Sequence, residues 1–144
     1  MMAFEVIGTG LLLMFITTGI HALFMVGASH THEWRQRRFG HANSEFGKAL
    51  FISMLTIWMF LAIIIEAWVW ALVYLYDPLI TVLNDIETAL YFSMVTFTTL
   101  GYGDVVLVGK GRGLATIQAA NGVIIFGWTT ALIFYFIQKI YKTD

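Results

Sequence analysis

Three long apolar stretches divide the chain, and short polar segments separate them. They cover about residues 3–28, 48–76 and 114–141. A helix needs about 20 apolar residues to cross the roughly 30 Å hydrocarbon core of a bilayer, and each stretch is at least that long. The second is longer than a perpendicular helix needs, so we expect it to tilt or to protrude before Asp77 and Pro78 end it. The pattern predicts three transmembrane helices.

A fourth apolar segment, residues 85–98, is too short to cross the membrane, since a helix of this length spans only about 20 Å. Asn84 precedes it as the expected N-cap, and Glu87 follows three residues later. Non-helical backbone at membrane depth is tolerated only where it is buried in protein or lines water. We therefore predict a re-entrant helix whose C-terminal end, with its partial negative charge, points toward the middle of the membrane and favours a cation there.

The residues that follow this short helix, 96–104, suit neither a helix nor an ordinary strand. Gly101 and Gly103 tolerate positive φ, so the backbone can turn successive carbonyls to the same side. Carbonyl oxygens and the Thr99 hydroxyl are neutral ligands that can replace the water around an alkali cation without trapping the ion. One chain supplies only one side of such a cage, which predicts several copies around an axis.

At this segment the chain resembles the potassium channel pore-domain family. The family's Thr-x-x-Thr-x-Gly-Tyr-Gly-Asp filter pattern is matched at six positions, with Leu100 where Val or Ile is usual: Thr96, Thr99, Gly101, Tyr102, Gly103 and Asp104. The resemblance covers about residues 48–141. It implies an all-α membrane protein that assembles as a homotetramer, with three transmembrane helices in each subunit, a re-entrant pore helix and a selectivity filter.

The resemblance also implies a division of the chain. Residues 1–47 form an extra N-terminal transmembrane helix, expected to pack peripherally against 48–76, and a cytoplasmic linker. The pore domain, 48–144, consists of an outer helix at 48–76, a pore helix at 85–98, a filter at 99–103 and an inner helix at 114–141.

Potassium is the ion that the resemblance implies, and no organic cofactor is expected. Its expected ligands are carbonyls and one hydroxyl in the filter, at Thr99, Leu100, Gly101, Tyr102 and Gly103. The residues expected to support the filter are Tyr91, Phe92, Thr96, Asp104 and Glu66. Tyr91 and Phe92 stand where the family usually has a Trp pair, and the Tyr91 hydroxyl can reach Asp104.

The inner helix carries the residues that the resemblance links to gating. Gly122 stands where a glycine hinge is usual, and Gly127 serves either bending or close helix packing. Polar Asn121 and Thr130 are expected to line a wet cavity, whereas Phe126 and Phe134 are expected to narrow the route below it.

Glu66 interrupts the second apolar stretch, and a carboxylate at membrane depth usually has a partner. His21 is one candidate, but depths counted at about 1.5 Å per residue leave a gap between them that only a favourable tilt would close. We expect Glu66 to bond to hydroxyls behind the filter, Ser93 or Thr96, as a brace or a regulatory proton site. Local satisfaction of a protonated Glu66 by a backbone carbonyl is the alternative.

The linker, residues 29–46, contains His30, His32 and His41. It could act as a pH-sensitive collar, because histidine titrates near neutrality, or as an interfacial helix. A solvated connector with aromatic anchors is the plainer interpretation. A metal site at His30 and His32 is disfavoured, because no further ligands accompany them at helical spacing.

Charge predicts the orientation. Residues 109–113 are expected to form an outer loop with Lys110 and Arg112, which leaves the other six cations on the cytoplasmic side. These are Arg35, Arg37, Arg38, Lys48, Lys139 and Lys142. The positive-inside bias then places the N-terminus outside and the C-terminus in the cytoplasm, in the plasma membrane.

Composition excludes several classes of protein. Of the residues, 59% are hydrophobic and 12% are charged, against about 45–50% and about 25% in soluble domains. The net charge of −1 gives no support for a nucleic-acid partner, and without cysteine there is neither a disulfide nor a thiolate metal site. An intramembrane enzyme is disfavoured, because the membrane histidine and glutamate lack a nucleophile, a metal set or a second carboxylate.

The predicted function is passive, potassium-selective conduction by a homotetramer embedded in membrane lipid. Two alternatives remain open: a weakly selective cation channel, and a non-conducting partner subunit of a channel assembly. No arginine-rich sensor helix is present, so the gating stimulus is not apparent, and a separate regulatory subunit could supply it.

Overall fold

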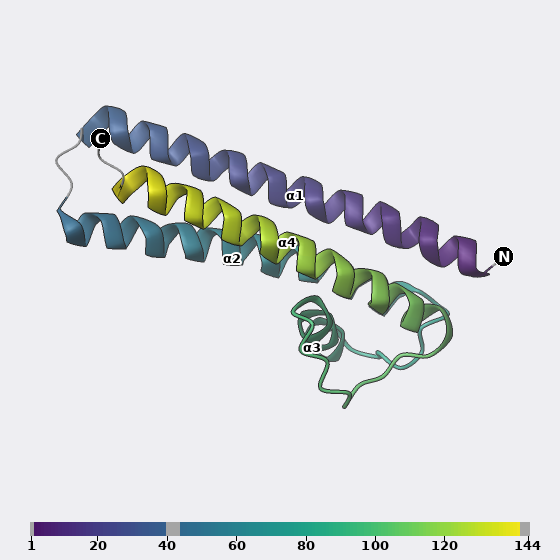
Figure 1. The fold of residues 1–144 in the computed structure, drawn as a ribbon. Helices are drawn as coiled ribbons and strands as arrows, with labels where there is room; N and C mark the ends of the chain where they lie inside the picture. Colours follow the sequence, from purple (N-terminus) through teal and green to yellow (C-terminus); the bar gives the residue numbers. More distant parts are fainter. Residues whose placement is uncertain (1, 40–43, 142–144) are drawn as a thin grey trace.

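The protein consists of four helices in a computed structural model that describes residues 2–39 and 44–141 (Figure 1). They are α1 (Met2–Phe39), α2 (Glu45–Tyr76), α3 (Ile86–Phe97) and α4 (Gly109–Tyr141). No strand occurs among the described residues. The three long helices are long and apolar enough to cross a membrane, and α3 is not. The all-α membrane architecture that we predicted is confirmed.

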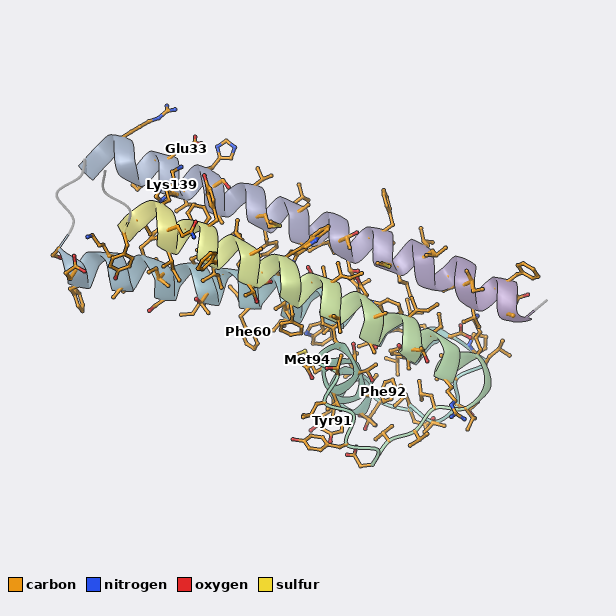
Figure 2. All side chains as sticks on the ribbon, viewed as in Figure 1. Glu33, Phe60, Tyr91, Phe92, Met94 and Lys139 are labelled. Carbon is orange, nitrogen blue, oxygen red and sulfur yellow. The ribbon has the colours of Figure 1, made fainter. Side chains whose placement is uncertain are left out.

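The long helices lie side by side, with α2 antiparallel to α1 and α4 (Figure 1). α3 and the loop after it lie against α2 and α4, near the end of the bundle where α1 begins. α4 ends at the opposite end. Apolar side chains project outward along the long helices, as expected for surfaces in contact with lipid (Figure 2).

α1 continues well past the span predicted for it. We expected the helix to stop near Ala28 and a polar linker to follow, but the helix runs to Phe39. No Gly or Pro interrupts residues 29–39, and the Ser29 and Thr31 hydroxyls donate to carbonyls one turn earlier. α1 also packs against both α2 and α4, so the expected peripheral position beside the outer helix alone is wrong.

α2 and α4 both begin earlier than the hydropathy indicated. α2 begins at Glu45, because the Ser44 hydroxyl accepts a bond from the Gly47 amide and caps the helix. α4 begins at Gly109, so the outer loop expected at 109–113 is its first helical turn. A Cβ at Gly113 would stand 2.7 Å from the Val6 side chain. The glycine there serves close packing on α1 rather than a turn.

α3 has its N-cap one residue later than expected. Asp85 caps the helix, and its Oδ1 accepts from the Thr88 amide at 2.8 Å. Its Oδ2 accepts from the Thr88 hydroxyl at 2.7 Å. Asn84 is therefore not the cap. These two bonds hold the pKa of Asp85 below its usual value.

Two buried clusters hold the bundle together. The one near α3 joins all four helices and includes Leu13, Trp70, Tyr74, Phe97 and Leu114. The other lies toward the opposite end of the bundle and joins α1, α2 and α4 through Ala28, Phe51, Leu55, Met59, Leu132 and Phe136. α1 contributes to both clusters, so it is an integral part of the core.

An ion pair outside the spanning segments joins the end of α2 to the start of α4. Lys110 Nζ lies 2.7 Å from Asp77 Oδ2, and both side chains are partly exposed. Burial acts to raise the pKa of Asp77, but the Lys110 ammonium and the Leu79 amide outweigh it, so the pKa is lowered. The pair therefore stabilises the fold only while Asp77 is ionised.

We predict that Asp77→Asn lowers the free energy of unfolding by about 1 kcal/mol at neutral pH, as expected for a partly exposed pair. Because the folded pKa is depressed, this stabilisation is fully present above the usual aspartate value of about 4 and is lost as the pH falls through the lower folded value. Thermal unfolding in detergent, with Lys110→Met and the double variant, measures the coupling. Strictly additive effects of the two substitutions would contradict the prediction.

Candidate ion-conduction site

The backbone after α3 alternates in handedness through the predicted filter. Positive φ values occur at Thr99 (59°), Gly101 (55°) and Gly103 (81°), and not at the residues between them. The two glycines were expected to adopt such values. Thr99 was not, because a β-branched residue at positive φ carries a strain of about 1–3 kcal/mol.

The C-terminal turn of α3 holds the start of this segment. The Thr99 amide donates to the Thr96 carbonyl at 2.9 Å. The Leu100 and Gly101 amides both donate to the Val95 carbonyl, at 3.0 and 3.3 Å. The amides at the start of the segment therefore point back to the helix, and they stabilise the strained Thr99 conformation.

The filter residues themselves are exposed within one chain. Leu100 is 56% exposed and Tyr102 is 67% exposed. A hollow of about 370 Å³ lies between α3, the loop after the filter and α4, and its lining includes Thr96, Val106 and Ala119. One chain alone therefore leaves both the filter side chains and this hollow uncovered.

One expected support of the filter is present in the structure. The Tyr91 hydroxyl donates to Asp104 Oδ2 at 2.6 Å, which lowers the pKa of Asp104. The neighbouring Phe92 lies on a different face of α3, where it is buried edge-on against the Tyr74 ring at 5.3 Å (Figure 2). One residue of this pair therefore contacts the loop after the filter, and the other contacts α2.

A buried network behind the filter was missed by sequence reasoning. Gln118 of α4 accepts from the Tyr74 hydroxyl at 2.8 Å and donates to the Ser93 hydroxyl at 2.7 Å. Ser93 in turn donates to the Ala67 carbonyl at 2.7 Å. The side chains of Tyr74, Ser93 and Gln118 are all fully buried. Gln118 itself was a sequence signal for this network, because a glutamine inside an apolar span needs a hydrogen-bond partner.

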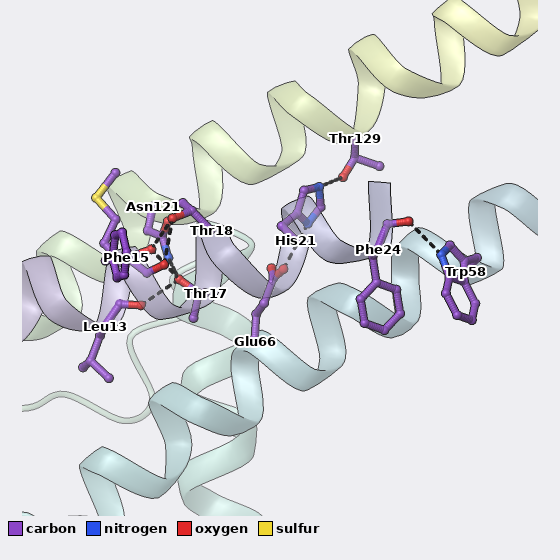
Figure 3. Close-up of polar contacts among 11 residues, drawn as sticks. Leu13, Phe15, Thr17, Thr18, His21, Phe24, Trp58, Glu66, Asn121 and Thr129 are labelled. Carbon is purple, nitrogen blue, oxygen red and sulfur yellow. Dashed lines mark hydrogen bonds and ion pairs between the residues drawn. The ribbon is translucent and has the colours of Figure 1, made fainter. Parts of the chain in front are cut away.

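Glu66 does not bond to Ser93 or Thr96, so that expectation is wrong. Its Oε1 lies 3.0 Å from His21 Nδ1, and both side chains are completely buried (Figure 3). His21, the candidate that the depth count left open only with a favourable tilt, is therefore the partner. Measured from Phe39, His21 lies about 27 Å from the end of α1, and Glu66 lies about 32 Å from the start of α2, and the packing of α1 on α2 closes the remaining difference of about 5 Å.

The four residues expected to line the cavity or to narrow the route below it differ in how deeply they are buried. Asn121 is completely buried and donates to the Thr17 hydroxyl of α1 at 2.7 Å, so its side chain does not line a wet cavity in this chain (Figure 3). Thr130 is exposed and donates to the Phe126 carbonyl at 2.8 Å. Phe126 is half-buried near Phe97, whereas Phe134 is 58% exposed.

The two inner-helix glycines have different surroundings. A Cβ at Gly122 would collide with the carbonyl of Phe97, the last residue of α3. No atom of the described chain lies within 4 Å of the position that a Cβ would take at Gly127. Close helix packing, which we considered for Gly127, therefore occurs at Gly122 instead. Gly127 has room around it for a side chain.

The histidines of the predicted linker lie mostly on a helix. His30 is exposed on α1. His32 is buried near the Phe51 and Phe136 rings, at 5.5 and 5.0 Å. His41 lies outside the described residues. Within those residues no group of three or more His, Asp or Glu side chains could hold a metal ion.

A short re-entrant helix that delivers a glycine-rich loop between two spanning helices defines a pore-loop channel subunit. Residues 58–139 match the model of an ion channel family, of the two-helix, potassium channel pore type. The match covers more than half of the chain, so the chain belongs to this family. No curated protein and no solved structure matches it. The family resemblance inferred from the filter motif is confirmed, and α1 lies outside the matched residues.

We predict that alanine is tolerated at Gly127 and not at Gly122. Gly127→Ala should stabilise the helix by about 0.5–1 kcal/mol, because alanine has the higher helix propensity. Gly122→Ala must displace the backbone of α3, and we expect a loss of at least about 2 kcal/mol, typical of overpacking. Thermal unfolding of both variants in detergent measures the difference, and equal stabilities would contradict the prediction.

We also predict that Tyr91→Phe weakens the filter. Loss of the hydrogen bond to Asp104 should lower the thermal unfolding temperature slightly, and potassium flux through the variant should decay faster at constant driving force. Tyr76→Phe, at an exposed tyrosine at the end of α2, is the matched control. Unchanged stability and decay in Tyr91→Phe would show that the contact with Asp104 does not support the filter.

Proposed function

We propose that four copies of this chain form a potassium-selective channel, in which the carbonyls of the filter replace the water around the permeating ion. The observation that carries the proposal is the alternation of positive φ at Thr99, Gly101 and Gly103 within the motif. Such alternation allows successive carbonyls to face one side of the segment. Rings of neutral oxygen ligands bind the ion well enough for entry and weakly enough for release.

Fourfold assembly is supported by the surfaces that one chain leaves uncovered. Leu100 and Tyr102 of the filter are exposed, and the hollow between α3, the loop and α4 is open. Neighbouring subunits that pack against these surfaces would cover the tyrosine and close the ring of carbonyls. Members of this family are generally oligomeric and embedded in the membrane.

The position of α3 supports a cation as the permeating ion. α3 is capped by Asp85 at its N-terminus, and its C-terminal carbonyls lie where the filter begins. The negative end of the helix dipole then favours a cation in the middle of the membrane. We further propose the plasma membrane as the location, with α1 starting outside and α4 ending in the cytoplasm.

The test is a reversal potential measured in liposomes that contain the purified full-length protein, with potassium on one side and sodium on the other. We expect potassium to be preferred at least about tenfold, which corresponds to about 1.4 kcal/mol. Tyr102→Asp should reduce the preference, because family members with aspartate at this position also conduct sodium. Val82→Ala, in the loop between α2 and α3, is the control and should leave the preference unchanged.

Each contrary outcome identifies one of the alternatives. A reversal potential midway between those of the two ions would show a weakly selective cation channel. Folded protein that passes neither ion at any pH or voltage would show a non-conducting partner subunit.

A further inference from the structure

One imidazole ring joins the three long helices in the membrane interior. His21 of α1 contacts Glu66 of α2 through Nδ1, at 3.0 Å from Oε1. Its other nitrogen, Nε2, lies 3.2 Å from the Thr129 hydroxyl of α4 (Figure 3). His21 and Glu66 are completely buried. Neither contact belongs to the filter or to the network behind it.

The second oxygen of Glu66 indicates which protonation state this site favours. Oε2 is buried and has no hydrogen-bond partner among the described residues. A carboxylate with an unpaired buried oxygen is costly, and so is any net charge in an apolar interior. The favoured state is therefore the one in which His21 and Glu66 together carry no net charge, either as imidazolium with carboxylate or as imidazole with carboxylic acid.

This neutral state holds one proton more than the same two side chains hold in water at neutral pH. In water, glutamate is ionised above about pH 4.3, and histidine is uncharged above about pH 6.5. Separation of the helices and hydration of the pair therefore release one proton above about pH 6.5. By linkage, a rise in pH through this range weakens the packed arrangement.

The site lies next to the part of α4 that is freest to bend. Gly122 is fixed against the last residue of α3, and Asn121 is bonded to Thr17 of α1. Gly127 has no neighbour close to the position of a Cβ, and Thr129 follows two residues later. The bond from His21 therefore holds α4 just beyond its freest position.

We propose that His21 and Glu66 form a proton-binding site through which α1 holds the second half of α4, and that loss of the proton releases this half and increases conduction. The inference rests on the proposed function, because conduction is its final readout. The ligand is a single proton per subunit. The site differs from the linker histidines, because here a buried carboxylate of α2 contacts one imidazole nitrogen and a hydroxyl of α4 contacts the other.

Other titratable groups lie far from the pair along every helix packed near it. The nearest along α1 are Glu5 and His30, and along α2 they are Lys48 and Tyr74. Along α4, Arg112 and Tyr135 flank Thr129, and Glu87 and Tyr91 are the titratable residues of α3. Among these, Tyr135 is the nearest to the site in sequence, and it is uncharged below about pH 10.

The first experiment measures potassium flux into liposomes that contain the full-length channel, between about pH 5 and about pH 8, where histidine titrates. We expect flux through the unaltered protein to rise severalfold as the pH rises above about 6.5, and Glu66→Gln, which removes the carboxylate that keeps the extra proton in the packed state, to abolish this rise. His30→Gln, at an exposed histidine on the same helix as His21, should retain the rise. Retention of the rise in Glu66→Gln, or its loss in His30→Gln, would overturn the proposal.

A second measurement is independent of conduction. Thermal unfolding of the purified protein should occur at lower temperature as the pH rises above about 6.5, and Glu66→Gln should remove this trend. In His21→Gln the uncharged packed state keeps the proton on Glu66, so the decline in stability should instead begin near the aqueous glutamate value of about 4.3. Thr129→Val cuts the contact with α4 and leaves the pair intact, so it should retain the trend in stability and lose the pH dependence of flux. If Glu66→Gln does not fold, Thr129→Val and the lower onset in His21→Gln still carry the test.

The two measurements distinguish failure of the proposed channel function from failure of the proton site or of its coupling to conduction. The stability trend without flux at any pH would reject the proposed channel function and support the proton site. The stability trend with flux that does not depend on pH would reject the coupling of the site to conduction. Absence of the trend in the unaltered protein would reject the site itself.

Discussion

The structure depends on one constraint, which is that backbone polar groups at membrane depth must be bonded or must face water. Among the described residues, α3 is the helix too short to span, and a long non-helical loop follows it. Its first amides are bonded back to the Thr96 and Val95 carbonyls. In a helix or a sheet the carbonyls of this segment would pair with amides, whereas here they are left available to a ligand. The strain at Thr99 accompanies this arrangement, and the last turn of α3 holds it in place.

The same requirement for paired polar groups explains how α3 is fixed in position. Ser93 bonds to the Ala67 carbonyl of α2 and accepts from Gln118 of α4, which ties the middle of α3 to both helices. Gly122 brings α4 into contact with the Phe97 carbonyl at the end of α3. Hydrogen bonds behind the helix and backbone contact at its end therefore add to the apolar packing of Phe92 and Phe97 in fixing the position of α3.

Local patterns were sufficient to predict the parts of the fold that depend on local chemistry. Hydropathy predicted the three spans, and the glycines at 101 and 103 predicted a backbone of alternating handedness. Errors arose where a result depended on a helix end. Polar residues 29–39 continue α1 where a linker was expected. Counting depth along single helices left a gap between His21 and Glu66 that the packing of α1 on α2 closes. The conformation of Thr99 depends on hydrogen bonds to the last turn of α3, and the bonds of Gln118 depend on neighbours from other helices, so hydropathy and motif spacing reveal neither.

α1 lies outside the residues that match the ion channel family, yet it supplies partners to residues inside them. Its Thr17 accepts from Asn121, and its His21 contacts both Glu66 and Thr129. Asn121 and Glu66 are fully buried, and a lipid tail in place of α1 would leave their polar groups without these partners at several kcal/mol each. The pore domain of this chain is therefore built to be completed by a third helix. Its inner helix contacts α1 along the same stretch that carries its two glycines, so any bend of α4 at Gly127 must be accommodated by α1.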